Sequence, residues 1–256
     1  MTRVALFAAG LAGAFLAALA LGKSLDVEAR TVAAEAEHGG MAAAVPAGLA
    51  VEQDGYRLVQ ERESLVAARQ APYDFRIVGP DGETVRDFEV EQERRLHLVV
   101  VDRARPETFL HLHPRRRADG SWTVPLTLPL AGSYRVFADF TTGGVRRTLG
   151  IDVAATGPRR LVERRIPAYE VALDEDGERL EFRVTKNGRP VEVEPYLGAG
   201  GHLVVLREGD LAYVHAHAEE DELAFDVPFP SEGRYRLYLQ FKVEGVVETA
   251  RFEVER

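Results

Sequence analysis

Turn signals that contain glycine interrupt the sequence at intervals of about ten residues from residue 49 to the C-terminus. Asp54-Gly55, Asp119-Gly120, Asn187-Gly188 and Glu244-Gly245 are examples, and short apolar runs lie between such signals. Runs of this length, bounded by turn residues, are typical of the strands of a β-sandwich or barrel. No sustained helical periodicity occurs beyond residue 30. The sequence therefore predicts an all-β fold for this part of the chain.

An internal repeat divides the same region into two halves of about a hundred residues each. Four segments of the first half have counterparts in the second: 74–77 and 181–184, 97–101 and 202–206, 109–113 and 213–217, and 132–137 and 233–238. The offset between counterparts falls only from 107 to 101 residues, so insertions are few. We predict two tandem Ig-like β-sandwich repeats, over residues 49–156 and 166–256, joined by a polar linker at residues 157–165.

The first 23 residues have the pattern of a targeting segment. Residues 4–22 are uncharged and mainly apolar, and a helix of this length just spans the hydrocarbon core of a bilayer. We predict an uncleaved transmembrane signal-anchor at residues 1–23. A cleaved signal peptide, with Ala18-Leu19-Ala20 as the cleavage site, is the alternative. We therefore expect a single-pass cell-membrane protein whose bulk is extracytoplasmic and is tethered by residues 24–48, which are rich in Ala and Glu.

Composition excludes several kinds of site. With 41 acidic and 32 basic side chains, the chain has a net charge of −9, which argues against nucleic-acid binding. The absence of cysteine excludes disulfides, a thiolate nucleophile, iron–sulfur and blue-copper centres, and zinc sites with cysteine ligands. The sequence has no nucleophile-elbow, phosphate-binding-loop, dinucleotide-binding or His-Glu-x-x-His motif. We therefore expect a protein that is not an enzyme.

Six of the seven histidines occupy equivalent places in the two repeats, and the seventh, His38, lies in the expected tether. The six are His97, His111 and His113 in the first repeat and His202, His215 and His217 in the second. Residues i and i+2 of a strand share a face, so the two histidines of each His-x-His segment point the same way. The histidines are therefore the residues most suited to form a site.

The expected hairpins bring the third histidine of each repeat to the same face. In the second repeat, a turn centred on Glu208-Gly209 places His202 opposite His215, and a turn centred on Gly209-Asp210 places it opposite His217. In either register three imidazoles gather on one face, because directly opposed side chains project from the same side of a sheet. The first repeat gives the same result if its loop, around residues 103–105, has an odd number of residues.

Three neighbouring imidazoles form a nitrogen-donor site suited to Cu(II) or Zn(II), and less suited to Ni(II). Cu(I) is disfavoured, because thioethers and thiolates select it and Met41 is the one such side chain in the expected exported part. The sequence predicts that all six histidines are metal ligands in a protein that buffers metal or delivers it to a transporter. The alternative is a structural or protein-interaction module of the cell envelope whose histidines are packed and hydrogen-bonded. A pH-sensing or partner-binding role is a third interpretation.

The residues around the histidines also resemble a known family. The segments that carry the resemblance are Arg95–Val101, Phe109–Pro114 and Trp122–Leu128, then Gly201–Val204 and Leu211–His217. They are similar to uncharacterised, membrane-anchored exported proteins of actinobacteria, over essentially the whole chain. Genes of that family tend to lie near heavy-metal transport genes, which implies metal handling by association. A more distant similarity is to periplasmic copper-resistance sandwiches of the CopC or YtkA-like type. This chain differs from many of them because it has no methionine cluster and, with an uncleaved anchor, no free N-terminal histidine.

Overall fold

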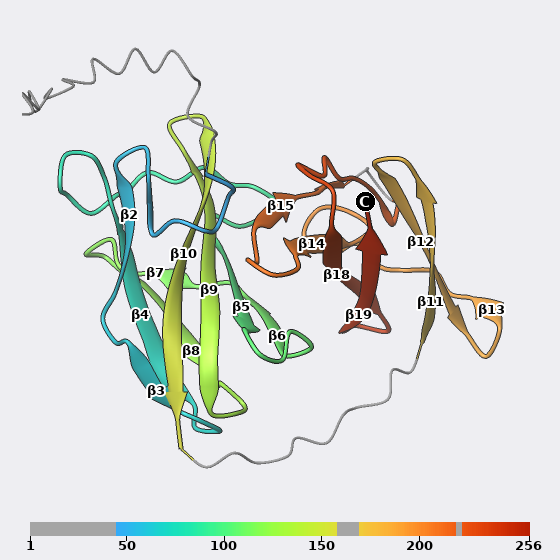
Figure 1. Cartoon of the computed structure of the whole chain (residues 1–256), viewed down its shortest axis with the longest axis horizontal. Coiled ribbons are helices and arrows are strands. Elements are labelled where there is room, and N and C mark those ends of the chain that lie inside the picture. The colour runs from blue at the N-terminus through green and yellow to red at the C-terminus, as the bar shows by residue number, and fades with distance from the viewer. Residues whose placement is uncertain (1–44, 158–168, 219–221) are drawn as a thin grey trace, which may run out of the picture. The chain divides into compact units, whose positions relative to one another are not determined.

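The computed structural model describes residues 45–157, 169–218 and 222–256, which are built from β-strands (Figure 1). Nineteen strands and no helix occur in these ranges, which confirms the all-β prediction. Within the same ranges no helix is long and apolar enough to cross a membrane. The expected anchor at residues 1–23, most of the expected tether and all but the first residue of the expected linker lie outside the described residues.

The first repeat consists of two five-stranded sheets. One sheet has the order β1-β2-β4-β8-β7, formed by β1 (Glu52–Gln53), β2 (Tyr56–Gln60), β4 (Ala71–Val78), β8 (Trp122–Leu126) and β7 (Arg115–Arg116). The other has the order β3-β10-β9-β5-β6, formed by β3 (Ser64–Val66), β10 (Val145–Thr156), β9 (Gly132–Thr142), β5 (His97–Asp102) and β6 (Phe109–Leu112). Neighbouring strands are antiparallel, apart from the parallel pair β3 and β10.

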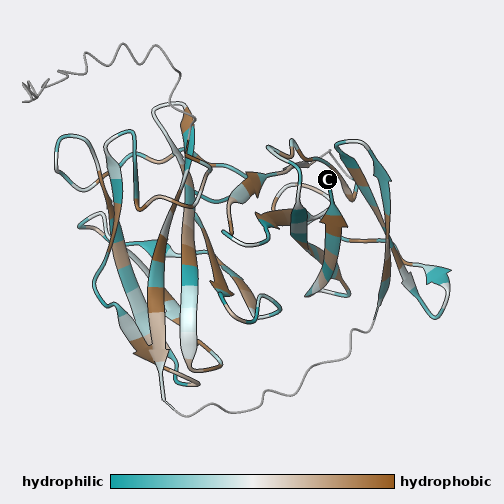
Figure 2. Cartoon of the chain, viewed as in Figure 1, coloured by the Kyte–Doolittle hydropathy of each residue, from teal (hydrophilic) through white to brown (hydrophobic). Residues whose placement is uncertain are grey.

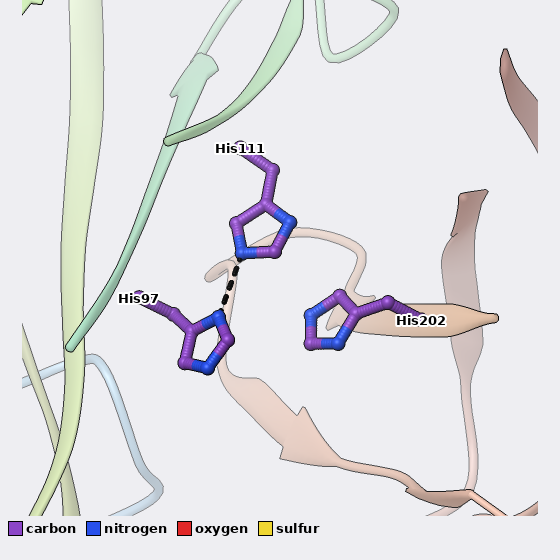
Figure 3. Close-up of side chains that lie close together, drawn as sticks. All are labelled: His97, His111 and His202. Atoms are coloured by element: carbon purple, nitrogen blue, oxygen red, sulfur yellow. Dashed lines mark hydrogen bonds between the residues drawn. The ribbon is translucent and has the colours of Figure 1, made fainter. Parts of the chain in front are cut away.

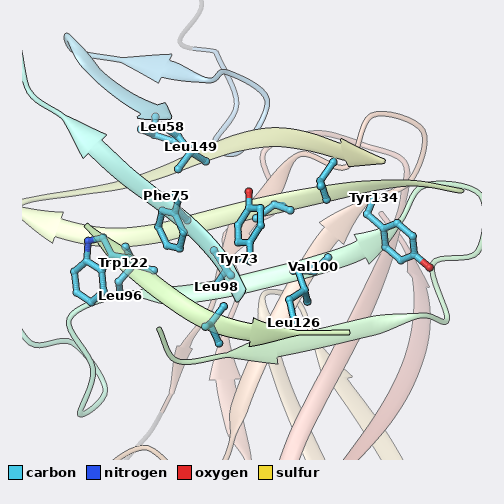
Figure 4. Close-up of a cluster of buried hydrophobic side chains, with 14 of the residues drawn as sticks. Leu58, Tyr73, Phe75, Leu96, Leu98, Val100, Trp122, Leu126, Tyr134 and Leu149 are labelled. Atoms are coloured by element: carbon cyan, nitrogen blue, oxygen red, sulfur yellow. The ribbon is translucent and has the colours of Figure 1, made fainter. Parts of the chain in front are cut away.

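The core of the first repeat lies between these two sheets, because alternate residues of each strand point inward (Figure 4). Tyr73 and Phe75 of β4 belong to the same buried cluster as Leu98 and Val100 of β5. Fully burying an aliphatic or aromatic side chain of this size stabilises the fold by about 1.5–3 kcal/mol. The two sheets therefore form a β-sandwich.

The second repeat also consists of two sheets, one of five strands and one of four. One sheet has the order β11-β12-β17-β16, formed by β11 (Glu170–Asp176), β12 (Arg179–Lys186), β17 (Ala224–Asp226) and β16 (His217–Ala218), with β13 (Arg189–Pro190) also paired to β12. The other has the order β15-β14-β18-β19, formed by β15 (Tyr213–His215), β14 (His202–Arg207), β18 (Arg234–Val243) and β19 (Val246–Glu255). Its core includes Phe182, Phe225 and Leu237, from strands of both sheets.

A tyrosine occupies the same place in both cores. Tyr134 of β9 and Tyr235 of β18 are fully buried. The hydroxyl of Tyr134 donates to the carbonyl of Leu130 at 2.8 Å, and that of Tyr235 donates to the carbonyl of Ser231 at 2.7 Å. A buried hydroxyl needs such a partner, because an unpaired one costs free energy. The shared contact is the structural counterpart of the Gly-x-Tyr-Arg repeat in the sequence.

A third apolar cluster joins the two repeats, and we call it the interface cluster. It consists of Val99, Val101, Phe109 and Phe137 from the first repeat and Val204, Leu206, Leu211, Tyr213 and Tyr238 from the second. It forms because β5 and β14 are apolar on both faces: Leu98 and Val100 point into their own sandwich, whereas Val99 and Val101 point outward. Figure 2 shows β14 in the brown of hydrophobic residues.

Contacts in the interface cluster exchange equivalent residues of the two repeats. The rings of Phe109 and Tyr238 are stacked, with centroids 4.2 Å apart. Phe137 and Tyr213, their counterparts in the opposite repeats, have centroids 5.6 Å apart. Because each repeat presents the same surface to the other, the interface has an approximate two-fold relation, as in an isologous dimer.

Residues just before the first strand also take part in the fold. The amide of Gly48 donates to the carbonyl of Thr148 at 2.8 Å, and the amide of Tyr213 donates to the carbonyl of Ala47 at 2.8 Å. Gly48 has φ +77°, and a Cβ there would lie 2.7 Å from the ring of Phe137. The end of the segment that we expected to be a tether is therefore hydrogen-bonded to both repeats.

Candidate metal centre

Two equivalent strands begin with a histidine. β5 begins at His97, which lies opposite Asp139 of β9, and β14 begins at His202, which lies opposite Gln240 of β18. Alternation along each strand puts both histidines on the face that carries the interface cluster. Their rings are 5.3 Å apart between centroids, with planes 7° apart, and the residues are only 2% and 3% exposed. The two strands thus bury two imidazoles side by side, one from each repeat.

The β5–β6 hairpin adds His111, and His113 follows directly after β6. Val99 pairs with His111, so the loop has an odd number of residues, which is the condition set for a three-histidine face. The ring centroids of His97, His111 and His113 lie 4.8–5.3 Å from one another. The gathering expected in the first repeat is therefore present.

The corresponding histidines of the second repeat are divided between two sheets. Val204 pairs with His215, which is the register of a turn centred on Gly209-Asp210. β15 ends at His215, and His217 begins β16, which pairs with β17 in the opposite sheet. The expected face of three histidines on one hairpin is therefore wrong for this repeat, because the chain crosses between the sheets at Ala216.

The closest group of histidines draws on both repeats (Figure 3). One ring nitrogen each from His97, His111 and His202 lies within 4.8 Å of the others, and such a group could hold a metal ion. Figure 3 shows the three rings pointing toward a common space from different sides. Among the residues that the structure describes, no other group of this kind occurs.

The hydrogen-bond partners of His97 and His111 orient their ring nitrogens. Nε2 of His97 lies 3.1 Å from the carbonyl of Glu91, which can only accept, so Nε2 carries the proton. Nδ1 of His111 lies 2.6 Å from Oε1 of Gln240 and donates to it. In neutral rings, the remaining nitrogens, Nδ1 of His97 and Nε2 of His111, then carry lone pairs. These nitrogens face each other at 3.0 Å, an arrangement that a shared cation would stabilise.

Buried ring nitrogens without partners lie beside this pair. Neither nitrogen of His202 has a hydrogen-bond partner among the described residues, and Nε2 of His113 also lacks one there. An unsatisfied buried polar group costs roughly 1–3 kcal/mol. A metal ion bound at these nitrogens would remove part of that cost.

Burial keeps these imidazoles neutral. Desolvation, together with the charges of neighbouring histidines, lowers the pKa of His111 to about 3 and that of His113 to about 4. Desolvation also lowers the pKa of His97 and, more strongly, that of His202. Metal ligation requires an unprotonated nitrogen, so at neutral pH a metal ion would not have to displace protons from these rings.

His215, the counterpart of His111, has different neighbours. Its Nε2 lies 3.1 Å from Oγ1 of Thr148, and its Nδ1 lies 3.9 Å from Oδ1 of Asp139. Asp139 is itself paired with Arg146, whose guanidinium lies 2.6 Å from Oδ2. The Arg146 charge, aided by His215, outweighs burial and lowers the pKa of this carboxyl.

Sequence reasoning did not identify Glu91, Gln240, Asp139 or Arg146. Asp139 and Gln240 had a usable signal, since each is a polar residue in an otherwise apolar strand segment, two positions after an aromatic residue of the repeat. Glu91 had none, because it contributes its backbone carbonyl and not its side chain.

A sequence family described as "Domain of unknown function (DUF8832)" matches residues 50–157 and 168–256, which is most of the chain. No curated protein matches the sequence.

Several solved structures are similar to the chain. One is FdeC, an adhesin of Escherichia coli, with 14% identity and a TM-score of 0.29 over 80% of this chain and 65% of that one. Another is InvD of Yersinia pseudotuberculosis, with 13% identity and a TM-score of 0.28 over 80% of this chain and 58% of that one. A titin Z1Z2 tandem also matches, with 11% identity and a TM-score of 0.22 over 76% of this chain and 94% of that one. The chain thus spans less than two thirds of the length of the two bacterial structures. At these TM-scores the matches carry no argument about function.

Proposed function

The chain belongs to the DUF8832 family, and we propose that it binds a divalent transition-metal ion, Zn(II) or Cu(II), through His97, His111 and His202. One observation carries the proposal. Nδ1 of His97 and Nε2 of His111 lie 3.0 Å apart, and a third buried imidazole beside them has no hydrogen-bond partner in the described part of the chain. Neutral imidazole nitrogens are common ligands of both ions.

The spacing of the nitrogens supports such a site. Two ligands of a tetrahedral zinc ion, each at 2.0–2.1 Å, are about 3.3 Å apart. The 3.0 Å between Nδ1 of His97 and Nε2 of His111 is close to that value. The ring of His202 is stacked on that of His111, with centroids 4.4 Å apart, so it has to rotate about its χ2 bond to direct a nitrogen at the same ion. Because both of its nitrogens lack partners, that rotation breaks no hydrogen bond among the described residues.

His113 is the fourth ligand in this proposal. Its ring lies 4.8 Å from that of His111 and 5.3 Å from that of His97, and its Nε2 is buried. Structural zinc sites have four ligands, so a fourth imidazole closes the site, whereas catalytic sites keep a position open. A closed site suits a protein that holds metal and does not catalyse a reaction.

The cellular role extends this proposal. The apolar segment at residues 4–22 supports a membrane-anchored protein whose β-sandwiches are extracytoplasmic. In that position a metal-binding protein buffers metal outside the cytoplasm or delivers it to a transporter in the same membrane. The resemblance to exported proteins encoded near heavy-metal transport genes, and the distant similarity to copper-resistance sandwiches, favour the same role.

Metal content tests the proposal. The full chain, purified in detergent and stripped with a chelator, is dialysed against Zn(II) or Cu(II), and the bound metal is measured by mass spectrometry. We expect one ion per chain, with nitrogen couplings of imidazole type in the electron paramagnetic resonance spectrum of the Cu(II) form. His202→Ala should lose the ion, and His38→Ala is the matched control that should keep it.

The alternative is that the histidines only pack the contact between the repeats. The observation in its favour is that His97 and His202 stack at the edge of the interface cluster, where flat rings fill space. In that case the wild-type protein binds no ion, and His202→Ala lowers the melting temperature by leaving a cavity. That combination would refute the metal assignment.

A further inference from the structure

The approximate two-fold relation of the interface extends to the histidines. His111 of the first repeat bonds Gln240 of the second. His215 is the counterpart of His111, and it lies against Asp139, the counterpart of Gln240. His97 and His202, one from each repeat, stack on each other at the same interface. By the two-fold relation of the repeats, His215 is the equivalent of His111 and thus a second potential third ligand for His97 and His202.

An ion pair breaks this equivalence on one side. Oδ2 of Asp139 accepts from Arg146 at 2.6 Å, and Oδ1 accepts from the hydroxyl of Thr148 at 2.9 Å. In the second repeat, the corresponding positions are an uncharged amide, Gln240, and an apolar side chain, Val247. A buried carboxylate and its guanidinium thus stand where the other half has two neutral residues.

The same ring nitrogen is engaged differently in the two histidines. Because the hydroxyl proton of Thr148 goes to Asp139, its oxygen is free to accept from Nε2 of His215, 3.1 Å away. Nε2 of His111 instead lies 3.0 Å from Nδ1 of His97, with its lone pair directed into the cluster. The charge of Arg146 also acts on His97 and His202, and it opposes a second cation on its side.

We infer that the Asp139–Arg146 ion pair, acting through Thr148, selects the third ligand of the metal site by holding His215 away and leaving the position to His111. This inference rests on the proposed metal site and goes beyond it, because it assigns positioning roles to residues that touch no metal. It also predicts that the interface binds one ion and not two.

A rescue experiment tests the selection. The double change Asp139→Gln/Arg146→Val copies the Gln240/Val247 pair of the second repeat and leaves no buried charge without a partner. His111→Ala alone should weaken Zn(II) binding by roughly 100-fold or more, since even second-shell changes cost 10–100-fold. Adding the double change should restore the affinity to within roughly tenfold of the wild type, because His215 then serves as the ligand. A further His215→Ala should abolish the restored binding.

Several outcomes separate this inference from the proposed function. A wild-type chain that binds no Zn(II) refutes both. A wild-type chain that binds one ion, together with a folded triple variant that binds as weakly as His111→Ala, refutes only the selection by Asp139 and Arg146. If the triple variant does not fold, Thr148→Val in the His111→Ala background releases Nε2 of His215 by a smaller change. It should also recover binding, and a folded variant without recovery overturns the inference.

Discussion

The hairpins β5–β6 and β14–β15 carry the same histidine pattern and use it differently. His111 of the first directs a nitrogen into the histidine cluster, whereas the nitrogen of His215 in the second meets Thr148 beside Asp139. Equivalent residues pair in both hairpins, Val99 with His111 and Val204 with His215, and both hairpins have an apolar outer face. The difference arises from the opposite repeat, since each hairpin faces residues that the other repeat supplies. The chemistry of equivalent histidines therefore depends on the residues that the opposite repeat places beside them.

The pH dependence of the metal-free protein should be the largest effect. His97, His111, His113 and His202 have lowered pKa values when folded, so the unfolded chain binds more protons between those values and about 6.5. The free energy of unfolding should therefore be highest above about pH 7 and should fall as the pH drops toward 4. Each histidine that stays unprotonated in the folded state should lower the free energy of unfolding by about 2 kcal/mol between pH 7 and pH 5.

Denaturant titrations at several pH values measure this loss. His111→Gln should remove about 2 kcal/mol of the decrease between pH 7 and 5, because one of the excluded protons is gone. A metal-free protein that is equally stable at pH 7 and pH 5 contradicts the neutral cluster.

The charged half of the interface should be more sensitive to truncation than the neutral half. Arg146→Ala leaves the buried carboxylate of Asp139 without its partner and should destabilise the fold by about 3 kcal/mol. Val247→Ala, at the equivalent position, removes a partly exposed side chain and should cost less than about 0.5 kcal/mol. Chemical unfolding of both variants at pH 7 gives the comparison, and equal losses would show that the ion pair contributes little.

The second histidines of the two His-x-His segments, His113 and His217, should differ in metal binding. His113→Ala removes the proposed fourth ligand and should weaken Zn(II) binding about tenfold, or about 1.4 kcal/mol. His217→Ala should leave the affinity unchanged, because its backbone pairs in the sheet opposite to that of His202. Competition with a chromogenic chelator measures both. A loss of affinity in the His217 variant equal to that in the His113 variant would contradict the assignment of His113, and not His217, as the fourth ligand.

The smallest effect concerns one hydroxyl. Thr148→Val removes the group that links Asp139 and His215 and should cost about 1 kcal/mol, the contribution of a typical buried hydrogen bond. Thr249→Val changes the equivalent threonine, which lies beside the uncharged half of the interface, and should cost less. Thermal unfolding of the two variants is sufficient, and a greater loss in Thr249→Val would reverse the comparison.

Much of the fold follows from local sequence patterns. Turn residues and alternation predict the strands, and the self-similarity of the chain predicts two equivalent sandwiches. The Gly209-Asp210 register and the odd loop of the first repeat were among the predicted alternatives, because two-residue alternation restricts the choices. Such patterns predict which strands of a hairpin pair and in which register, so they describe structure within one sheet.

The candidate site itself was only half predictable. Its histidines stand out in the sequence, but their grouping depends on the packing of one repeat against the other, over contacts such as His97 with His202. No local pattern encodes that packing, since the outward valines of β5 and β14 show only that both faces are covered. The orienting carbonyl of Glu91 is part of the backbone, and every residue type has one.

The isologous contact between the repeats has a consequence for how such a protein can change over generations. In a homodimer, one codon specifies both copies of every residue at the interface, so any substitution occurs on both sides of the axis at once. A tandem chain specifies the two sides separately. Arg146 can therefore face the interface once, with Val247 in the mirror position. Because one polypeptide carries both halves, the two sides can mutate independently, and a pair of identical subunits could not have this asymmetry.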